Sequence, residues 1–304
     1  MRSFSPETRV HEPVLLKEVV ALLNPRPGQV VVDGTLGSGG HAKEIMQYLG
    51  PQGRLIGLDQ DPEALERAKR TLEHFTNVEF LQANFSELEA VLKRLNLNRI
   101  DAVLLDVGLS SEQLGTADRG FSFLKEGSLD MRMDPRSLVT ARDLVNDLSQ
   151  GELETLFRES GEERWSKRIA AAVSRERQKK PIETTRQLTE IIEKSVPRPA
   201  RFGPRHPAMR VFQALRIRVN RELAALEETL PQAFRALKRG GRLAVISFHS
   251  LEDRIVKQTF REWLKRGEAR VLTPKPVRAT EEEMRRNPRS RSAKLRVVER
   301  IKNS

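Results

Sequence analysis

The sequence predicts an α/β protein with a parallel, Rossmann-like sheet and an inserted α-helical domain. Four short apolar runs alternate with segments of helical periodicity, and this order specifies parallel strands joined by right-handed crossovers. The runs lie at 30–33, 55–59, 78–81 and 100–106. After Val107 the alternation stops, and mostly helical patterns follow until a fifth run, LAVISF, at 243–248. We therefore expect helices to interrupt the sheet after its fourth strand.

The segment VVVDGTLGSGGH at 30–41 organises the predicted site. Glycines follow Asp33 at the end of the first strand, so the backbone can turn sharply and approach a ligand at the next helix. The second run ends in Asp59, at a spacing typical of the acid that accepts hydrogen bonds from an adenosine ribose. The turn is not G-x-G-x-x-G, and it contains no Lys or Arg to hold a pyrophosphate. These features favour S-adenosylmethionine over NAD.

Two further strand ends point to the same edge. Ligands of doubly wound sheets bind at the carboxyl ends of the strands. Phe85 follows the third run and Asp106 ends the fourth. The sequence leaves two roles open for Phe85, which either packs on the adenine or belongs to the core.

Composition restricts the function further. The chain has 304 residues, a formal net charge of +12 and a pI of about 10.3, which indicates a nucleic-acid partner. It contains no cysteine, which excludes disulfides, cysteine metal sites and thiolate nucleophiles. Methylation at carbon 5 of a pyrimidine usually needs a cysteine nucleophile, so the absence of cysteine argues against this reaction. We also expect no metal site. No apolar run approaches 18 residues and the N-terminus is polar, so we expect a cytoplasmic protein without a membrane partner.

Two basic segments are candidates for contacts with phosphates. Residues 196–221 contain seven arginines and no acid, and residues 261–304 contain 14 Lys or Arg against 6 Asp or Glu. A long helix is expected from Pro207 to Pro231. The irregular stretch 115–135 is interpreted as a mobile, substrate-covering loop, in which Phe121 or Phe123 either stacks an extruded base or packs in the core.

Over nearly its full length the chain resembles the bacterial 16S ribosomal RNA (cytosine-N4)-methyltransferases that act on a P-site cytidine. The resemblance rests on His11 with PVLL after it, DGTLGSGGH at 33–41, LLDVGLSSEQL at 104–114, DRGFSF at 118–123, LDMRMDP at 129–135, GEERWSKRIA at 161–170, HPAMRVFQALRIRVN at 206–220, ISFHSLEDRIVK at 246–257 and NPRSRSAKLRVVER at 287–300. So many long motifs in one order are very specific.

The resemblance implies a class I S-adenosylmethionine-dependent methyltransferase domain at 1–112 and 213–304, with a helical substrate-recognition domain at 113–212. The implied cofactor contacts are Gly39, Gly40, His41, Asp59, Phe85, Asp106 and Gln113. The implied partner is small-subunit ribosomal RNA or the assembled 30S subunit. The sequence leaves the oligomeric state open, including a homodimer.

The chemistry requires that the exocyclic N4 be held in line with the methyl group while its hydrogens are accepted. Many DNA amino-methyltransferases use D/N/S-P-P-Y/F after the fourth strand, whereas this chain has DVGLS at 106–110. The candidates for the accepting group are Asp106, Ser110 and His249, each beside the end of a strand.

Two other classes of function stay open from the residues alone. An NAD-dependent oxidoreductase would share the early β-α-β pattern, but it should show the G-x-G-x-x-G turn. A non-catalytic RNA-binding protein would keep the arginines, but it would not need polar residues at four strand ends.

Overall fold

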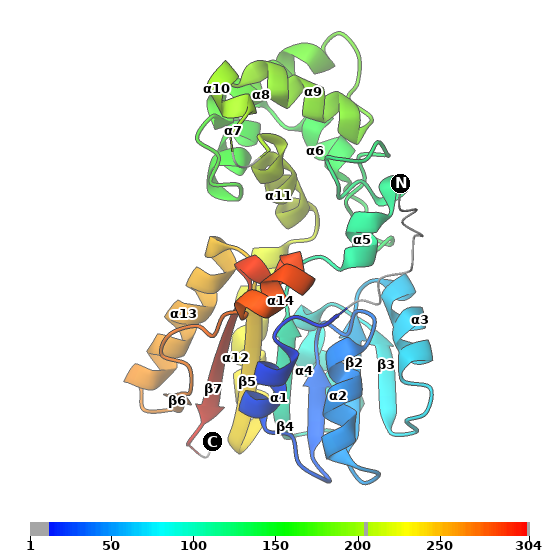
Figure 1. Cartoon of the computed structure of the whole chain (residues 1–304), viewed down its shortest axis with the longest axis vertical. Coiled ribbons are helices and arrows are strands. Elements are labelled where there is room, and N and C mark those ends of the chain that lie inside the picture. Colours follow the sequence, from blue (N-terminus) through cyan, green and yellow to red (C-terminus); the bar gives the residue numbers. More distant parts are fainter. Residues whose placement is uncertain (1–11, 204–205, 303–304) are drawn as a thin grey trace. The chain divides into compact units, whose positions relative to one another are not determined.

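The computed structural model describes residues 12–203 and 206–302 (Figure 1). His11 and Arg205 lie outside the described residues. The chain splits into two compact units, Met1–Gly108 with Leu226–Ser304, and Leu109–Ala225.

The first unit contains a seven-stranded sheet in the order β3-β2-β1-β4-β5-β7-β6. Its strands are β1 (Val30–Asp33), β2 (Arg54–Asp59), β3 (Val78–Gln82), β4 (Ile100–Asp106), β5 (Leu237–Ser247), β6 (Ala269–Val271) and β7 (Lys294–Arg300). Strands β1 to β5 pair in parallel, and β7 runs antiparallel to both β5 and β6. The predicted parallel core is therefore confirmed, whereas the three-residue β6 was missed because it is too short to show a period.

Helices cover both faces of this sheet (Figure 1). They are α1 (Leu16–Leu23), α2 (Gly40–Leu49), α3 (Pro62–Thr71), the 3-10 turn η1 (Phe85–Glu87) with α4 (Leu88–Arg94), α12 (Glu222–Ala236), α13 (Ser250–Lys265), α14 (Glu281–Arg286) and the 3-10 turn η3 (Pro288–Ser292). Successive strand residues point to opposite faces. Accordingly Val32 packs in a core with residues of α4, α12 and α13, while Val31 packs in a second core with residues of α1, α2 and α3.

The second unit is helical. Its elements are α5 (Ser111–Gly115), the 3-10 turn η2 (Ala117–Arg119), α6 (Ala141–Asp147), α7 (Gln150–Glu159), α8 (Ser166–Arg177), α9 (Thr185–Ser195), α10 (Arg198–Arg201) and α11 (Ala208–Val219). Capping boxes at Ser149 and Thr184 start α7 and α9. One apolar core, with Phe157, Ile169, Leu188 and Leu215 buried in it, joins these helices.

The boundaries of the two units differ from the predicted ones. A division at 212/213 would cut α11, although Val211, Ala214 and Leu215 are all buried in the core of the helical unit. The chain leaves this unit only after α11.

The prediction of a single helix from Pro207 to Pro231 is wrong, because the structure has two helices there. The helical segment breaks in two. It breaks between α11 and α12 at Arg221, whose φ is +50°. Pro231 lies inside α12 instead of ending it. The flanking residues Leu230 and Ala233 are fully buried against the sheet, so packing outweighs the hydrogen bond that a proline removes.

Strand β5 begins at Leu237, earlier than the predicted 243. Its pairing with β4 shifts register between Ile100 and Ala102, whose partners are Leu237 and Arg242. Gly240, at φ +80°, lies in the extra residues of this irregularity and does not cap a helix. No helix in the described part of the chain combines the length and apolar character that a membrane crossing requires.

Candidate active site

Three acids end neighbouring strands at one edge of the sheet. Asp33, Asp59 and Asp106 are the last residues of β1, β2 and β4, and β1 lies between the other two strands. Parallel strands bring their carboxyl ends to the same edge, which is what the apolar runs predicted. Asp33 is also close enough to the other two carboxylates for their charges to affect its pKa.

The glycine turn (residues 33–41) connects β1 to α2. Gly37 has φ +54°, a conformation that favours glycine, and it donates its N–H to Asp59 Oδ2 over 2.8 Å. Gly39 is the N-cap of α2 at φ +83°. A Cβ on Gly40 would come within 2.4 Å of Pro13 Cγ. The turn is therefore held against both β2 and the residues that precede α1.

Asp59 is fixed by two backbone donors, Gly37 and Asp61, at 2.8 and 2.9 Å. Burial raises the pKa of Asp59 to about 6, although the same two hydrogen bonds act to lower it. Since each carboxylate oxygen has two lone pairs, both oxygens can accept a further hydrogen bond. The side chain thus suits a ligand hydroxyl without losing its own support.

Burial also raises the pKa of Asp33, to about 7, and the charges of Asp106 and Asp59 add to the shift. The Thr35 N–H opposes it by donating to Asp33 Oδ1 over 3.1 Å. A group of carboxylates that repel one another favours a positively charged ligand, because a cation relieves the repulsion.

His41 links the turn to Asp106. Its Nε2 lies 2.9 Å from the Val14 carbonyl, which can only accept, so Nε2 carries the hydrogen. Its Nδ1 lies 3.7 Å from Asp106 Oδ2. The Thr35 hydroxyl accepts a hydrogen bond from the Asp106 N–H over 2.6 Å. The Thr35 hydrogen bond thereby connects the glycine turn to the end of β4.

Phe85 lies in η1 and is half-buried against the core that α4 and α12 share. A Cβ on Gly34 would come within 3.3 Å of Phe85 Cβ, so this residue adjoins the glycine turn. Asn84, the N-cap of η1, donates its amide to Gln60 Oε1 over 2.9 Å. A contact of Phe85 with adenine stays a prediction.

Arg67 was missed by the sequence analysis. It lies on α3, and its Nε donates to Ser38 Oγ in the glycine turn over 3.4 Å. Its guanidinium also pairs with Glu63 at 3.7 Å. A basic side chain does therefore stand beside the turn, brought there by the fold from outside the turn sequence. Burial raises the pKa of Asp59 more than the positive charge of Arg67 lowers it.

Ser110 and Gln113 belong to the second unit, where they close the cap of α5. Ser110 Oγ accepts from the Gln113 N–H over 3.1 Å, and Gln113 Oε1 accepts from the Ser110 N–H over 3.0 Å. Both side chains thus have a local structural role. Their functional roles stay predictions.

His249 caps α13. Its Nδ1 accepts from the Glu252 N–H over 3.4 Å, and its Nε2 lies 3.0 Å from Glu252 Oε1. Glu252 is 2 % exposed, and its Oε2 accepts the N–H groups of both Phe248 and His249. The sequence analysis missed Glu252, although H-x-x-E at a helix start follows the spacing of a capping box.

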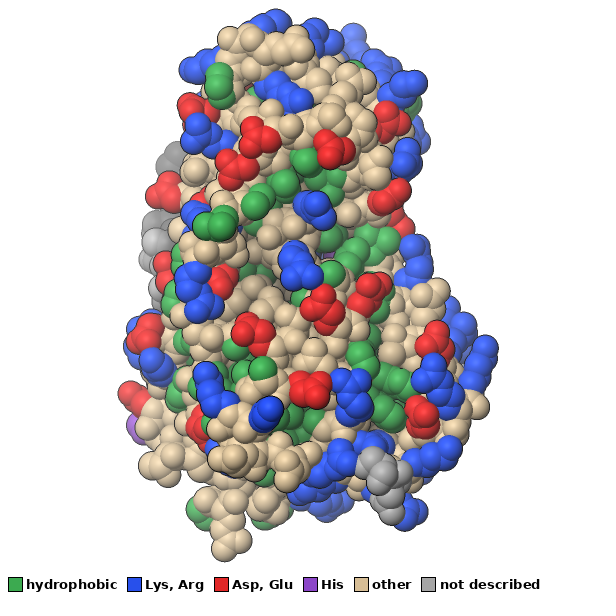
Figure 2. Space-filling view, turned by 180° about the vertical axis from the view of Figure 1, so that it is seen from behind, with side chains coloured by type: hydrophobic (Ala, Val, Ile, Leu, Met, Phe, Trp, Pro, Cys, Tyr) green, Lys and Arg blue, Asp and Glu red, His purple; other side chains and the backbone are tan. Residues whose placement is uncertain are grey.

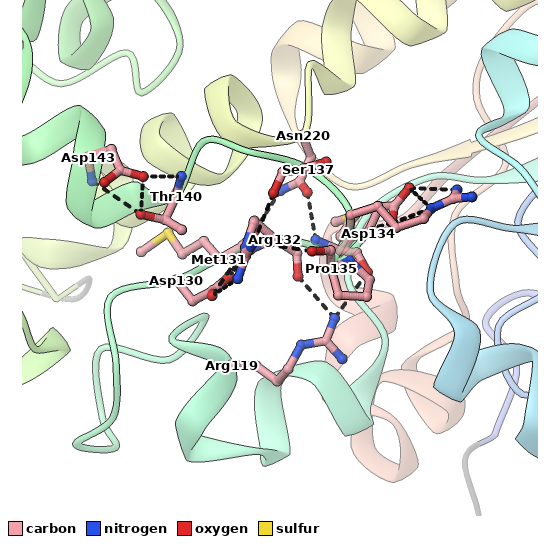
Figure 3. Close-up of polar contacts among 12 residues, drawn as sticks. Arg119, Asp130, Met131, Arg132, Asp134, Pro135, Ser137, Thr140, Asp143 and Asn220 are labelled. Carbon is pink, nitrogen blue, oxygen red and sulfur yellow. Dashed lines mark hydrogen bonds and ion pairs between the residues drawn. The ribbon is translucent and has the colours of Figure 1, made fainter.

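The stretch predicted to be a mobile loop is extensively hydrogen-bonded within the second unit (Figure 3). The Asn220 amide accepts from the Met133 N–H and donates to the Met131 carbonyl, over 2.7 and 2.8 Å. Arg119 donates to the carbonyls of Arg132 and Met133. Asp130 forms a bidentate pair with Arg132, and Asp134 forms one with Arg136. The Asn220 hydrogen bonds thereby tie this stretch to the end of α11.

The two aromatic residues of this stretch also pack in the second unit. Phe121 is 4 % exposed within its apolar core. The Phe123 ring stacks on His206 at 4.7 Å between centroids and meets Phe212 edge-on. Phe121 therefore packs in the core, which is one of the two roles predicted for it, the other being to stack an extruded base.

Part of the arginine-rich segment is already engaged. Arg216 pairs with Glu222 at 2.7 Å, and Arg201 donates to the carbonyls of Val196 and Lys194. Arg198 is exposed on α10. Figure 2 shows Lys and Arg side chains spread over one face of the molecule with Asp and Glu between them.

The chain is similar to known proteins over almost its whole length. A model of the MraW methylase family matches residues 8–301. The chain is 49 % identical to Ribosomal RNA small subunit methyltransferase H of Heliobacterium modesticaldum, with 96 % of this chain and 99 % of the relative covered. Proteins of the same name from Pelobacter propionicus and Geotalea daltonii are each 51 % identical, with 96 % of this chain and 98 % of each relative covered. The resemblance predicted from the sequence is confirmed, and the chain belongs to the MraW methylase family.

Proposed function

We propose that this protein transfers a methyl group from S-adenosylmethionine to the exocyclic N4 of a cytidine in small-subunit ribosomal RNA. The observation that carries the proposal is the near-full-length match to relatives named as small-subunit ribosomal RNA methyltransferases. The site at the strand ends supports it, since its residues suit this cofactor.

The residues present fit S-adenosylmethionine, which supplies an electrophilic methyl group on a positively charged sulfonium. Asp33, Asp59 and Asp106 give one edge of the sheet a concentration of negative charge that favours such a cation. Asp59 would accept the ribose hydroxyls, Phe85 would pack on the adenine, and Gly39, Gly40 and His41 would form the wall of the site. A cofactor contact of Gln113 stays a prediction from the family resemblance.

For the amine, Asp106 is the acceptor that we favour among the three candidates. Ser110 Oγ accepts a hydrogen bond in the cap of α5, and His249 Nδ1 accepts one in the cap of α13. The Asp106 side chain is 19 % exposed at the end of β4. By accepting hydrogens from N4, this carboxylate would make the conjugated nitrogen lone pair available for attack on the methyl carbon.

The substrate is small-subunit ribosomal RNA, either naked or in the assembled 30S subunit, and the helical unit would recognise it. A cytoplasmic location follows from this substrate. A homodimer stays a prediction, which sedimentation velocity of the purified chain tests.

The proposal is tested by incubating the purified chain with methyl-labelled S-adenosylmethionine and either naked 16S ribosomal RNA or 30S subunits. We expect label in one of the two substrates, recovered as N4-methylcytidine. A thermal shift with NADH but not with S-adenosylhomocysteine would favour an oxidoreductase. Tight RNA binding without label in either substrate would favour a non-catalytic RNA-binding protein.

A further inference from the structure

The four residues that precede α1 lie directly against the glycine turn. In this strap (residues 12–15), Pro13 occupies the space that a Cβ on Gly40 would need, at 2.4 Å. The Val14 carbonyl accepts from His41 Nε2 over 2.9 Å. Val14 and Leu15 are almost fully buried. The position of the strap therefore determines how His41 and Gly40 are held.

One face of the C-terminal helix α14 holds the strap in turn. Glu283 Oε1 accepts the Leu15 N–H over 2.8 Å, and Asn287 Nδ2 donates to the Glu12 carbonyl over 3.0 Å. Arg286 pairs with the Glu12 carboxylate at 2.5 Å. Glu283 and Arg286 are one turn apart on the same face of α14, and Asn287 is the C-cap residue of this helix. Figure 1 shows α14 lying beside α1, although the two are at opposite ends of the sequence.

The carboxylate of Glu283 does not accept the N–H of its own N-cap residue, although its position in the helix predicts this contact. Thr280 and Glu283 have the spacing of a capping box, and Thr280 Oγ1 accepts from the Glu283 N–H over 3.2 Å. In α6, α7 and α9 the acid or amide at this position returns to the N–H of its own cap. In α14 it binds the Leu15 N–H instead.

Leu15 needs an external acceptor. It is the N-cap of α1, it has φ +55°, and its own side chain makes no cap hydrogen bond. A backbone N–H buried at a helix start must find a partner elsewhere, and Glu283 supplies one. The result is a continuous series of contacts from Glu283 through Leu15 and Val14 to His41.

We propose that α14 positions the cofactor side of the glycine turn through the strap, with Glu283 as the positioning residue. This inference rests on the proposed cofactor role of Gly39, Gly40 and His41. Glu283 itself touches neither the cofactor nor the RNA in this account. Its loss should therefore weaken cofactor binding and leave the chemical step intact.

The test compares three variants with the parental chain. Glu283→Ala removes the acceptor, Glu283→Gln keeps an oxygen that can accept the Leu15 N–H, and Glu282→Ala removes an exposed carboxylate from the same turn. We expect Glu283→Ala to raise the Kd for S-adenosylhomocysteine and the KM for S-adenosylmethionine by about 10-fold, the worth of one such hydrogen bond. Its kcat at saturating cofactor should stay within about 2-fold of the parental value. Glu283→Gln should recover most of the affinity, and Glu282→Ala should bind like the parental chain.

Hydrogen exchange separates this inference from the proposed function. Without any ligand, the Leu15 amide and the peptide containing His41 should exchange faster in Glu283→Ala than in Glu282→Ala. Parental exchange at both places, or a parental Kd, would overturn the inference. If the parental chain itself fails to bind S-adenosylhomocysteine, the proposed function fails, and exchange alone decides the role of the strap. If Glu283→Ala does not fold, Asn287→Ala takes its place, and parental exchange at residues 12–15 and at His41 in that variant overturns the inference.

Discussion

Gly37 donates its backbone N–H to the Asp59 carboxylate over 2.8 Å, which ties the turn after β1 to the end of β2. The Asp59 carboxylate therefore fixes the glycine turn, and its remaining lone pairs can accept hydrogen bonds from a ligand. A substitution that tests ligand binding at Asp59 must therefore keep an oxygen that can accept a backbone N–H.

Asp59→Asn should weaken binding of S-adenosylhomocysteine by about 10- to 100-fold. The ribose hydroxyls lose a charged acceptor worth roughly 1.5–3 kcal/mol, while the remaining amide oxygen can still accept one of the two N–H groups. Isothermal calorimetry measures the change, with Asp59→Ala as the comparison that also disturbs the turn. An unchanged dissociation constant in Asp59→Asn would end the ribose assignment.

Asp33 should make stability depend on pH. Its folded pKa is raised to about 7, mainly by burial, whereas an unfolded aspartate titrates near 3.9. Between these values the folded state holds a proton that the unfolded state has released, so stability falls as the pH rises from about 4 to about 7 and levels off above the folded pKa. From pH 6 to pH 8 the parental chain should lose roughly 1 kcal/mol through this group.

Asp33→Asn should remove that contribution, since an amide does not titrate and can still accept the Thr35 N–H. Urea unfolding of both chains at pH 6 and pH 8 gives the difference, in which the other titrating groups cancel. Equal pH dependence in the two chains would show that Asp33 does not titrate in this range.

Asp106→Asn should reduce kcat by about 10²- to 10⁴-fold, the usual effect of removing a general base. Binding of S-adenosylhomocysteine should change much less, because the amide keeps the size of the side chain. Ser110→Ala and His249→Gln serve as comparisons, since both residues already cap helices. A larger loss of kcat in either comparison variant, with binding retained, would move the acceptor role to that residue.

RNA binding by the arginine-rich segment should depend on salt. Replacing Arg198, Arg201 and Arg205 together by alanine should flatten the plot of log affinity against log salt by up to about two units, at about 0.7 for each phosphate contact. Cofactor affinity should not change. A matched control replaces Arg158, Arg175 and Arg186, each of which pairs with a glutamate. If both triple variants keep the parental slope, the segment is not part of the RNA-binding surface.

The sequence predicted the parts of the site that depend on local pattern. Apolar runs ending in acids placed Asp33, Asp59 and Asp106 at one edge, because parallel strands must align their carboxyl ends. The break after Asn220 could not be predicted in this way, since the Asn220 amide binds the backbone at Met131 and Met133, far away in the sequence. The pairing of Glu283 with Leu15 is equally non-local, and the local spacing favoured an ordinary capping box instead.

Other features had a local pattern that the sequence analysis passed over. Ser110 and Gln113 have the S-x-x-Q spacing of a cap, and His249 and Glu252 have an analogous spacing. Ser110 and His249 were predicted to have a chemical role because each lies beside the end of a strand. Arg67 had no such pattern, because α3 carries it to Ser38 only through tertiary packing.

Methyl transfer to N4 of a cytidine in small-subunit ribosomal RNA leaves a modified nucleoside that can be detected in cells. Its most direct test is nucleoside mass spectrometry of this RNA from cells with and without the gene, and from cells that carry the Asp106→Asn variant. We expect N4-methylcytidine only in cells that carry the parental gene. An unchanged amount of N4-methylcytidine without the gene, or loss of 5-methylcytidine in its place, would contradict it.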